Sequence, residues 1–146
     1  MVREALADHG GHEIKHTGDG IMAWFPSASR SLATAVELQA KTAAHNAGGE
    51  RDELAGALGI RVGLNTGEPI REDGDLHGTP VIVAARVADL ARGGQILVTD
   101  VVRLLAAGKG FSFRPAGTVS LQGISEPMAL FEVDWQASAG AAAELR

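Results

Sequence analysis

The chain has 146 residues, 45% of them hydrophobic and 21% charged, with a formal net charge of −5 and no cysteine, which suits one folded domain. The missing cysteine excludes disulfides, thiolate metal sites and a cysteine nucleophile, and scattered basic residues in an acidic chain argue against a nucleic-acid partner. Because no apolar run approaches the roughly 18–20 residues of a membrane span and the charged start lacks a signal-peptide core, we expect a cytoplasmic protein without a membrane partner.

The first half of the chain alternates helical and extended patterns. Asp-Gly at 19–20 supplies the backbone angles of a tight turn, so residues 17–20 are predicted to join two strands into a hairpin. Apolar residues at a helical period follow Pro26. In order, we predict a helix at 2–9, strands at 12–16 and 21–25, a helix at 27–46 and a loop at 47–55.

The second half mixes strands and helices in the same way, which indicates an α+β fold with an antiparallel or mixed sheet. The Ala/Gly/Ser-rich tail from residue 136 is expected to be frayed. In order, we predict a strand at 59–66, a short edge strand at 69–71, a charged loop at 71–75, a helix at 79–90, a strand at 95–99, a helix at 100–107, and strands at 111–119 and 128–133.

Asp19 is the first residue that suggests chemistry. A carboxylate at the tip of a tight hairpin is held rigidly and points outward, which suits a Mg²⁺ ligand. Asp is also the favoured residue of an ordinary turn. From spacing alone, the ordinary turn is the preferred interpretation.

Three ordered blocks change that interpretation. They are Lys15-His16-Thr17-Gly18-Asp19 to Ala23, Arg61-Val62-Gly63 to Gly67, and Asp75-Leu76-His77-Gly78 to Arg86. Together with Leu121 to Val133, which is similar to the last hairpin of the family, they resemble class III adenylyl and guanylyl cyclases. The resemblance covers residues 1–134, so we expect a cyclase domain there and a flexible tail over 135–146.

The resemblance implies a ferredoxin-like α+β fold, with a mixed or antiparallel sheet flanked by helices, and a specific reaction. ATP would be converted to cyclic AMP and pyrophosphate with two divalent ions, Mg²⁺ or Mn²⁺, at an interface between two chains. The pair could be a homodimer or a heterodimer with another cyclase chain. By position, Asp19 matches a metal ligand, Lys15 and Asp75 match the base-reading pair, and Arg86 matches the transition-state arginine.

The base-reading pair has donor and acceptor senses that suit adenine. Lys15 would donate to N1, which is an acceptor, and Asp75 would accept from the N6 amino group. Guanine has the opposite pattern at these atoms. Without the resemblance, Lys15 would be interpreted as a solvated strand residue and Arg86 as part of a surface ion pair.

Three departures from the family pattern predict impaired turnover. Ile82 occupies the position of the ribose-orienting asparagine, and Gln122 that of a triphosphate-binding lysine. The family's first strand, with its first metal-binding aspartate, has no counterpart in these residues. The alternatives are therefore a non-catalytic homologue that binds nucleotide weakly or pairs with a complete cyclase chain, and a misplaced or decayed gene start.

Overall fold

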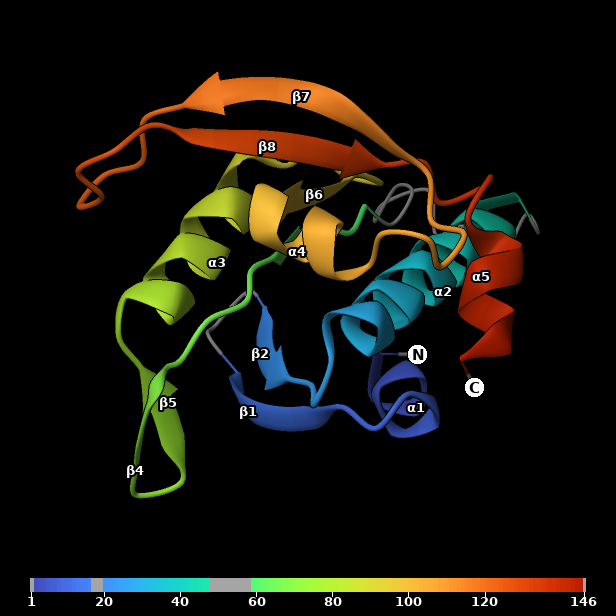
Figure 1. Cartoon of the computed structure of the whole chain (residues 1–146). Coiled ribbons are helices and arrows are strands. Elements are labelled where there is room, and N and C mark those ends of the chain that lie inside the picture. Colours follow the sequence, from blue (N-terminus) through green and yellow to red (C-terminus); the bar gives the residue numbers. More distant parts are fainter. Residues whose placement is uncertain (1, 17–19, 48–58, 146) are drawn as a thin grey trace, which may run out of the picture.

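The computed structural model describes residues 2–16, 20–47 and 59–145. Figure 1 shows β7 and β8 across the top, α3 and α4 beneath them, and the β1–β2 hairpin at the bottom. The elements are α1 (Val2–Asp8), β1 (His12–His16), β2 (Ile21–Trp24), α2 (Ala28–Ala47), β3 (Val62–Leu64), β4 (Ile70–Glu72), β5 (Asp75–His77), α3 (Thr79–Leu90), β6 (Ile96–Thr99), α4 (Asp100–Leu105), β7 (Phe113–Val119), β8 (Met128–Val133) and α5 (Ala139–Glu144).

The main sheet has the strand order β3-β6-β8-β7, with β3 parallel to β6 and the other pairs antiparallel. The predicted mixed sheet of an α+β fold is therefore confirmed. All four residues of β6 are buried, because successive side chains point to opposite faces and both faces are covered. Ile96 and Val98 pack into the cluster that contains Leu32 and Val36 of α2. Leu97 packs with Val83 and Val87 of α3.

Helix α3 lies directly against β3 at Gly63. A Cβ atom at this position would lie 2.2 Å from the backbone nitrogen of Ala88 and 2.8 Å from the carbonyl oxygen of Ala84. Only glycine allows this approach, so Gly63 sets the distance between helix and sheet.

Two hairpins lie outside the main sheet, and each forms a two-stranded sheet of its own. In β1–β2, His12 pairs with Trp24 and Lys15 with Met22, and the register shifts between Glu13 and Lys15. The predicted turn at 17–20 falls largely outside the described residues. The other hairpin, β4–β5, lies at the start of α3 (Figure 1).

The predicted loop at 71–75 is wrong, because these residues belong to the β4–β5 hairpin. Glu72 pairs with Asp75, and Asp73 and Gly74 form the turn with φ angles of 51° and 78°. Positive φ at both turn residues is typical of a two-residue hairpin turn, which Asp-Gly favours. The charges around Gly74 concealed this signal.

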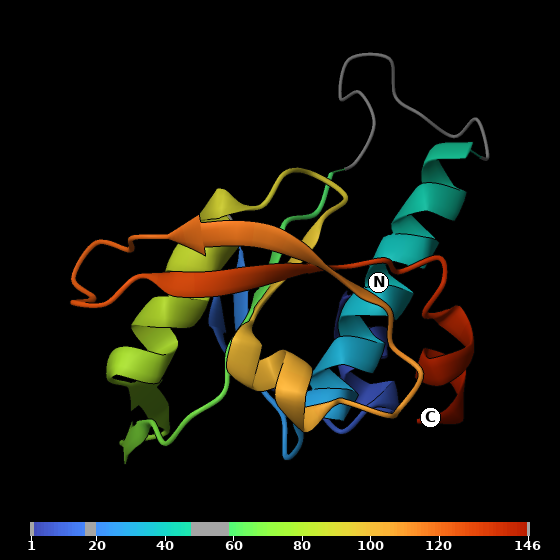
Figure 2. The same cartoon turned by 45° about the horizontal axis from the view of Figure 1, so that its top comes forward.

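The expectation of a frayed tail is also wrong for most of its length. Residues Ala139–Glu144 form α5, which packs on α2, and Figure 2 shows the two helices side by side. Ala141 and Ala142 are buried there. Their small side chains allow close helix contact. The domain boundary at residue 134 stays a prediction.

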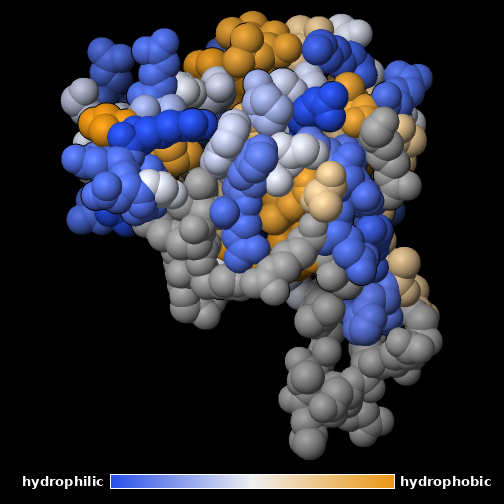
Figure 3. Space-filling model, turned by 90° about the horizontal axis from the view of Figure 1, so that it is seen from below, coloured by the Kyte–Doolittle hydropathy of each residue, from blue (hydrophilic) through white to orange (hydrophobic). Residues whose placement is uncertain are grey.

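The surface is mostly hydrophilic on the face seen from below, with a hydrophobic area visible in a hollow between the polar side chains (Figure 3). Within the described ranges, no helix is long and apolar enough to cross a membrane.

Candidate functional site

The two hairpins lie together, and this brings the strands of the predicted base-reading residues side by side. Strand β1, which carries Lys15, contacts β5, which begins at Asp75. Sixty residues separate the two in the sequence. The structure therefore brings into contact the two strands that carry these positions. The side chain of Lys15 is not among those the structure describes.

A stack of three side chains connects the hairpins. The His12 imidazole stacks on the Trp24 indole, with centroids 4.4 Å apart and planes inclined by 16°. The guanidinium carbon of Arg71 lies 4.7 Å from the centroid of the same indole. The sequence pattern does not predict this stack, because it places Arg71 where a short edge strand meets a solvated loop and indicates no partner for it. The His12–Trp24 pair could have been inferred from the hairpin register.

Asp75 is half-buried at the start of β5. Its Oδ1 accepts a hydrogen bond of 2.9 Å from the backbone N–H of Leu76. This bond restricts the rotation of the carboxylate. A carboxylate held in this way can accept a hydrogen bond from a donor at a defined position. Recognition of an amino group requires such an acceptor.

Arg86 lies on α3, with a half-buried side chain. Its Nε is buried and has no hydrogen-bond partner among the described residues. A buried donor without a partner costs about 1–3 kcal/mol, so such groups call for an explanation. Guanidinium donors match phosphate oxygens in geometry and charge. The orphaned Nε suits a residue whose partner is a bound anion.

Ile82 precedes Arg86 by one helical turn, so the two side chains lie on the same face of α3. Ile82 is 46% exposed. An isoleucine there offers no hydrogen bond to a ligand that reaches Arg86. Gln122 is exposed in the connection between β7 and β8, and Asp19 lies outside the described residues.

Asn65 holds the start of α3 in place, a role that no local sequence signal indicates. Its Oδ1 accepts a 2.8 Å hydrogen bond from the hydroxyl of Thr99 on β6, and its Nδ2 donates to the carbonyl of Pro80 at 3.1 Å. Thr99 is fully buried. The first turn of α3 is thereby fixed to the central strand at Pro80, two residues before Ile82 and six before Arg86.

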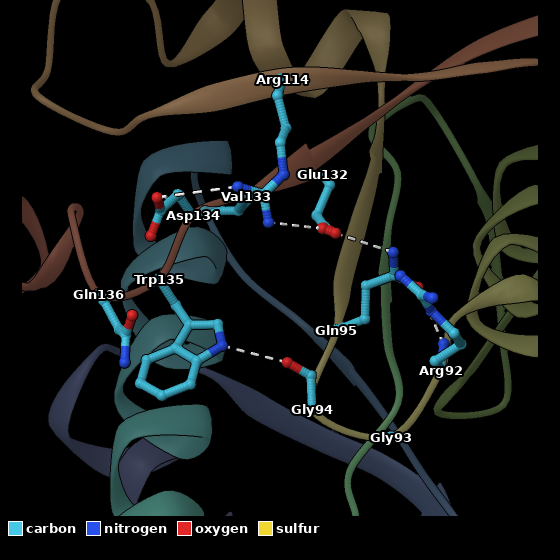
Figure 4. A pocket seen from close by; sticks show the side chains of 10 residues that line it. All are labelled: Arg92, Gly93, Gly94, Gln95, Arg114, Glu132, Val133, Asp134, Trp135 and Gln136. Atoms are coloured by element: carbon cyan, nitrogen blue, oxygen red, sulfur yellow. Dashed lines mark hydrogen bonds and ion pairs between the residues drawn. The ribbon is translucent and has the colours of Figure 1, made fainter.

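A polar cavity of about 520 Å³ lies at the start of β6 and the end of β8 (Figure 4), and none of the predicted site residues lines it. Arg114 is 2.9 Å from Glu132 and 3.8 Å from Asp134, and Gln95 donates to Glu132 at 2.9 Å. The hydrogen bond and charge of Glu132 raise the pKa of Arg114. The charges largely compensate one another, which indicates a structural network between β6, β7 and β8. The lining residues are Arg92, Gly93, Gly94, Gln95, Arg114, Glu132, Val133, Asp134, Trp135 and Gln136.

The described residues do not provide a metal site by themselves. Within 2–16, 20–47 and 59–145, no group of three or more His, Asp and Glu side chains could hold an ion. The one metal ligand that the resemblance implies, Asp19, lies outside these ranges.

Comparison with known proteins identifies the family. Residues 1–134 match the adenylate and guanylate cyclase catalytic domain. The chain belongs to this family. The match ends where β8 ends, so it includes both hairpins, the main sheet and α3.

The relatives include named adenylate cyclases. The chain is 34% identical over 129 residues to the putative adenylate cyclase 3 of Rhizobium meliloti, covering 88% of this chain and 22% of that protein. It is 32% identical over 124 residues to a pH-sensitive adenylate cyclase of Mycobacterium tuberculosis, covering 82% of this chain and 29% of that protein. This chain therefore spans about a fifth to a third of these relatives.

Solved structures of the family share this fold. An adenylate/guanylate cyclase/hydrolase from Silicibacter pomeroyi superposes with a TM-score of 0.81 at 30% identity, covering 91% of this chain and 78% of that one. The fold of an adenylate cyclase from Trypanosoma brucei, at 22% identity, superposes with a TM-score of 0.72 over 91% of this chain and 74% of that one. The cyclase fold expected from the sequence is confirmed.

Proposed function

We propose that this domain binds ATP and forms cyclic AMP and pyrophosphate at a site shared between two chains. The observation that carries the proposal is the junction of the hairpins, where the strands of Lys15 and Asp75 are in contact. The orphaned Nε of Arg86 on α3 supports a bound anion beside that helix.

The preference for ATP follows from the donor and acceptor pattern. A lysine donates and an aspartate accepts, as N1 and the N6 amino group of adenine require. With guanine, the lysine donor would face the N1 donor and the aspartate acceptor would face the O6 acceptor. Each unsatisfied buried polar group costs about 1–3 kcal/mol. The names of the relatives and structures include both adenylate and guanylate cyclases, so the choice of base rests on these two side chains.

In the proposed reaction, the 3′-oxygen of ATP attacks the α-phosphorus while the bond from that phosphorus to the bridging oxygen of the β-phosphate breaks. The proton of the 3′-hydroxyl passes to solvent, and the electron pair leaves with pyrophosphate. Arg86 would donate hydrogen bonds to the α-phosphoryl oxygens as charge develops there, which is the kind of stabilisation that accelerates phosphoryl transfer. A divalent cation bound through Asp19 would neutralise charge on the triphosphate.

The proposal includes a second chain because the family resemblance implies a site shared between two chains. It would be another copy of this chain or a related cyclase chain. In the family arrangement, one chain supplies the metal-binding carboxylates and the other supplies the base-reading residues and the arginine. An isolated chain would then be inactive.

A second candidate function is nucleotide binding without turnover. The observation that favours it is Ile82, exposed on the same face of α3 as Arg86 and unable to hydrogen-bond a ribose. Gln122, without a charge, would weaken the hold on the triphosphate. Loss of one preorganised donor typically costs a factor of about 10²–10³ in rate.

The test is a cyclase assay on the purified chain with Mn²⁺ and either ATP or GTP, run alongside a binding titration. We expect ATP to bind more tightly than GTP, and Arg86→Ala to abolish any cyclic AMP formation while the fold persists. ATP binding without product would select the non-catalytic function. If neither nucleotide binds at millimolar concentration, both proposed functions are wrong. Arg103→Ala, on α4, is the matched arginine control.

A further inference from the structure

The contact between the two hairpins depends on side chains. Among the described residues, no backbone ladder joins β1–β2 to β4–β5, since each hairpin is a separate sheet. A two-stranded hairpin alone is marginally stable and is easily displaced. The relative position of the two hairpins must therefore be fixed by packing and by specific contacts between them.

The stack formed by His12, Trp24 and Arg71 is such a contact. His12 and Trp24 face each other across β1–β2, and Arg71 reaches the indole from β4 at 4.7 Å. A guanidinium within about 6 Å of an indole centroid is attracted to the electron-rich face of the ring. The indole is half-buried while His12 and Arg71 are exposed at its sides.

Both predicted base-reading positions lie close to this stack along their strands. Lys15 follows His12 by three residues on β1. Asp75 pairs with Glu72, the residue after Arg71. The stack therefore joins the two strand pairs within a few residues of the positions that would contact the base.

We infer that Trp24 and Arg71 are positioning residues for base selectivity. By holding β4–β5 against β1–β2, the stack sets the separation between Lys15 and Asp75. Discrimination between bases needs both groups within hydrogen-bond distance at once, and hydrogen bonds weaken steeply with distance and misalignment. This inference rests on the proposed function, because it requires a base to lie between those two positions.

A different role for Arg71 would leave a different signature. If Arg71 bound the triphosphate, its loss would weaken ATP and GTP equally, since both carry the same phosphates. If it positions the hairpins, its loss reduces the preference for ATP. The ratio of the two affinities therefore separates the roles.

The experiment measures the affinities for ATP and GTP by calorimetry, using analogues that cannot be cleaved between the α- and β-phosphates. The variants are Arg71→Met, Arg71→Lys and, as control, Arg103→Met. The control removes the same kind of contact elsewhere, since Arg103 lies 4.5 Å from the centroid of the Phe131 ring. Thermal unfolding checks that each variant folds.

We expect Arg71→Met to lower the ATP-to-GTP affinity ratio by roughly fivefold, the equivalent of one cation–π contact. Arg71→Lys, which keeps the charge and part of the contact, should retain most of the ratio, and Arg103→Met should retain all of it. If Arg71→Met does not fold, Arg71→Lys and Trp24→Phe carry the test. A further variant, Trp24→Leu, removes the aromatic ring, and it should lower the ATP-to-GTP affinity ratio more than Trp24→Phe does.

Two results overturn the inference in distinguishable ways. If the unmodified chain prefers ATP and Arg71→Met keeps that preference, the stack does not set selectivity and the proposed function stands. If the unmodified chain binds neither analogue, or binds both equally, the assignment of Lys15 and Asp75 falls and the inference falls with it.

Discussion

Nε2 of His9 lies 2.8 Å from Oε2 of Glu37, and both side chains are almost fully buried, at 1% and 8% exposure. The pair joins the end of α1 to the middle of α2. Lys41, one turn further along α2, reaches the other oxygen of Glu37 at 3.3 Å and is more exposed. This carboxylate therefore contributes to the docking of α1 on α2.

Replacing Glu37 should therefore destabilise the protein strongly. Removing one partner of a buried hydrogen bond, such as that between His9 and Glu37, costs about 1–3 kcal/mol. We expect Glu37→Leu to lower the free energy of unfolding by an amount in this range, measured by urea denaturation. Lys41→Met is the control, and it should cost less than about 1 kcal/mol because its charge is largely solvated. Equal effects of the two variants would contradict the importance of the buried contact.

A methyl group at Gly63 should force α3 away from the sheet. The added Cβ would meet backbone atoms of Ala88 at 2.2 Å, which side-chain rearrangement cannot relieve. We expect Gly63→Ala to destabilise the fold by at least about 2 kcal/mol. Gly140→Ala is the matched control. It lies in α5 with nothing within 4 Å of the new Cβ, and it should stabilise by about 0.5–1 kcal/mol.

The Asn65–Thr99 hydrogen bond should show energetic coupling. Thr99→Val leaves Oδ1 of Asn65 without its donor. Asn65→Ala leaves the Thr99 hydroxyl without its acceptor and the Pro80 carbonyl without its donor. In a double-mutant cycle, residues in one hydrogen-bond network couple by about 0.5–3 kcal/mol. Unfolding free energies of the two single variants and the double variant measure this directly. Strict additivity would show that the bond contributes nothing.

Glu132 should make stability fall in acid. Burial raises the pKa of Glu132, but hydrogen bonds from Gln95 and Arg114 and the charges of Arg114 and Arg92 outweigh it and leave the pKa below 4.5. A lowered carboxylate pKa stabilises the fold above the unfolded-state value, and this contribution is lost as the pH falls through the native value. Urea unfolding at pH 7, 5, 4 and 3 should therefore show a smaller loss in acid for Glu132→Gln than for the unmodified chain. Glu126→Gln, at an exposed carboxylate between β7 and β8, should match the unmodified chain.

Reversing the donor and acceptor senses of the base-reading pair should reverse the preferred nucleotide. In the double variant Lys15→Glu and Asp75→Lys, the glutamate would accept from N1 of guanine and the lysine would donate to its O6 atom. We expect tighter binding of GTP than of ATP, measured by the same titration as for the unmodified chain. The single variants, with one mismatch for either base, should bind both weakly. A double variant that still prefers ATP would contradict the assignment.

The regular elements could be predicted because their signals are local. The helix at Thr79–Leu90 ends where the sequence predicted, since Pro80 suits a first turn and Gly93-Gly94 follows the end. The strands around Asp19-Gly20 were found from the turn residues. The β4–β5 hairpin was missed, although Asp73-Gly74 is the same turn signal, because three-residue strands leave too short an alternating pattern to detect.

The candidate site was predictable only where it repeats a family motif. Lys15, Asp75 and Arg86 came from the ordered blocks, and no periodicity would have found them. The contacts of Asn65 and Arg71 join segments far apart in the chain, and nothing in the local sequence encodes such pairings. The helical tail was missed because Ala and Gly suit both a flexible segment and a helix that packs closely on α2.

Strand β6 also constrains the order in which the chain can fold. It pairs with β3, more than thirty residues earlier, and with β8, about thirty residues later, whereas each hairpin pairs strands only a few residues apart. Contacts between distant segments form slowly, because a long loop must close first. During synthesis, the hairpins can form soon after they emerge, but the main sheet must wait until residues beyond Val133 have left the ribosome. Until then the apolar side chains of β6 have no complete sheet to enter, and this interval is when the nascent chain is most exposed to aggregation.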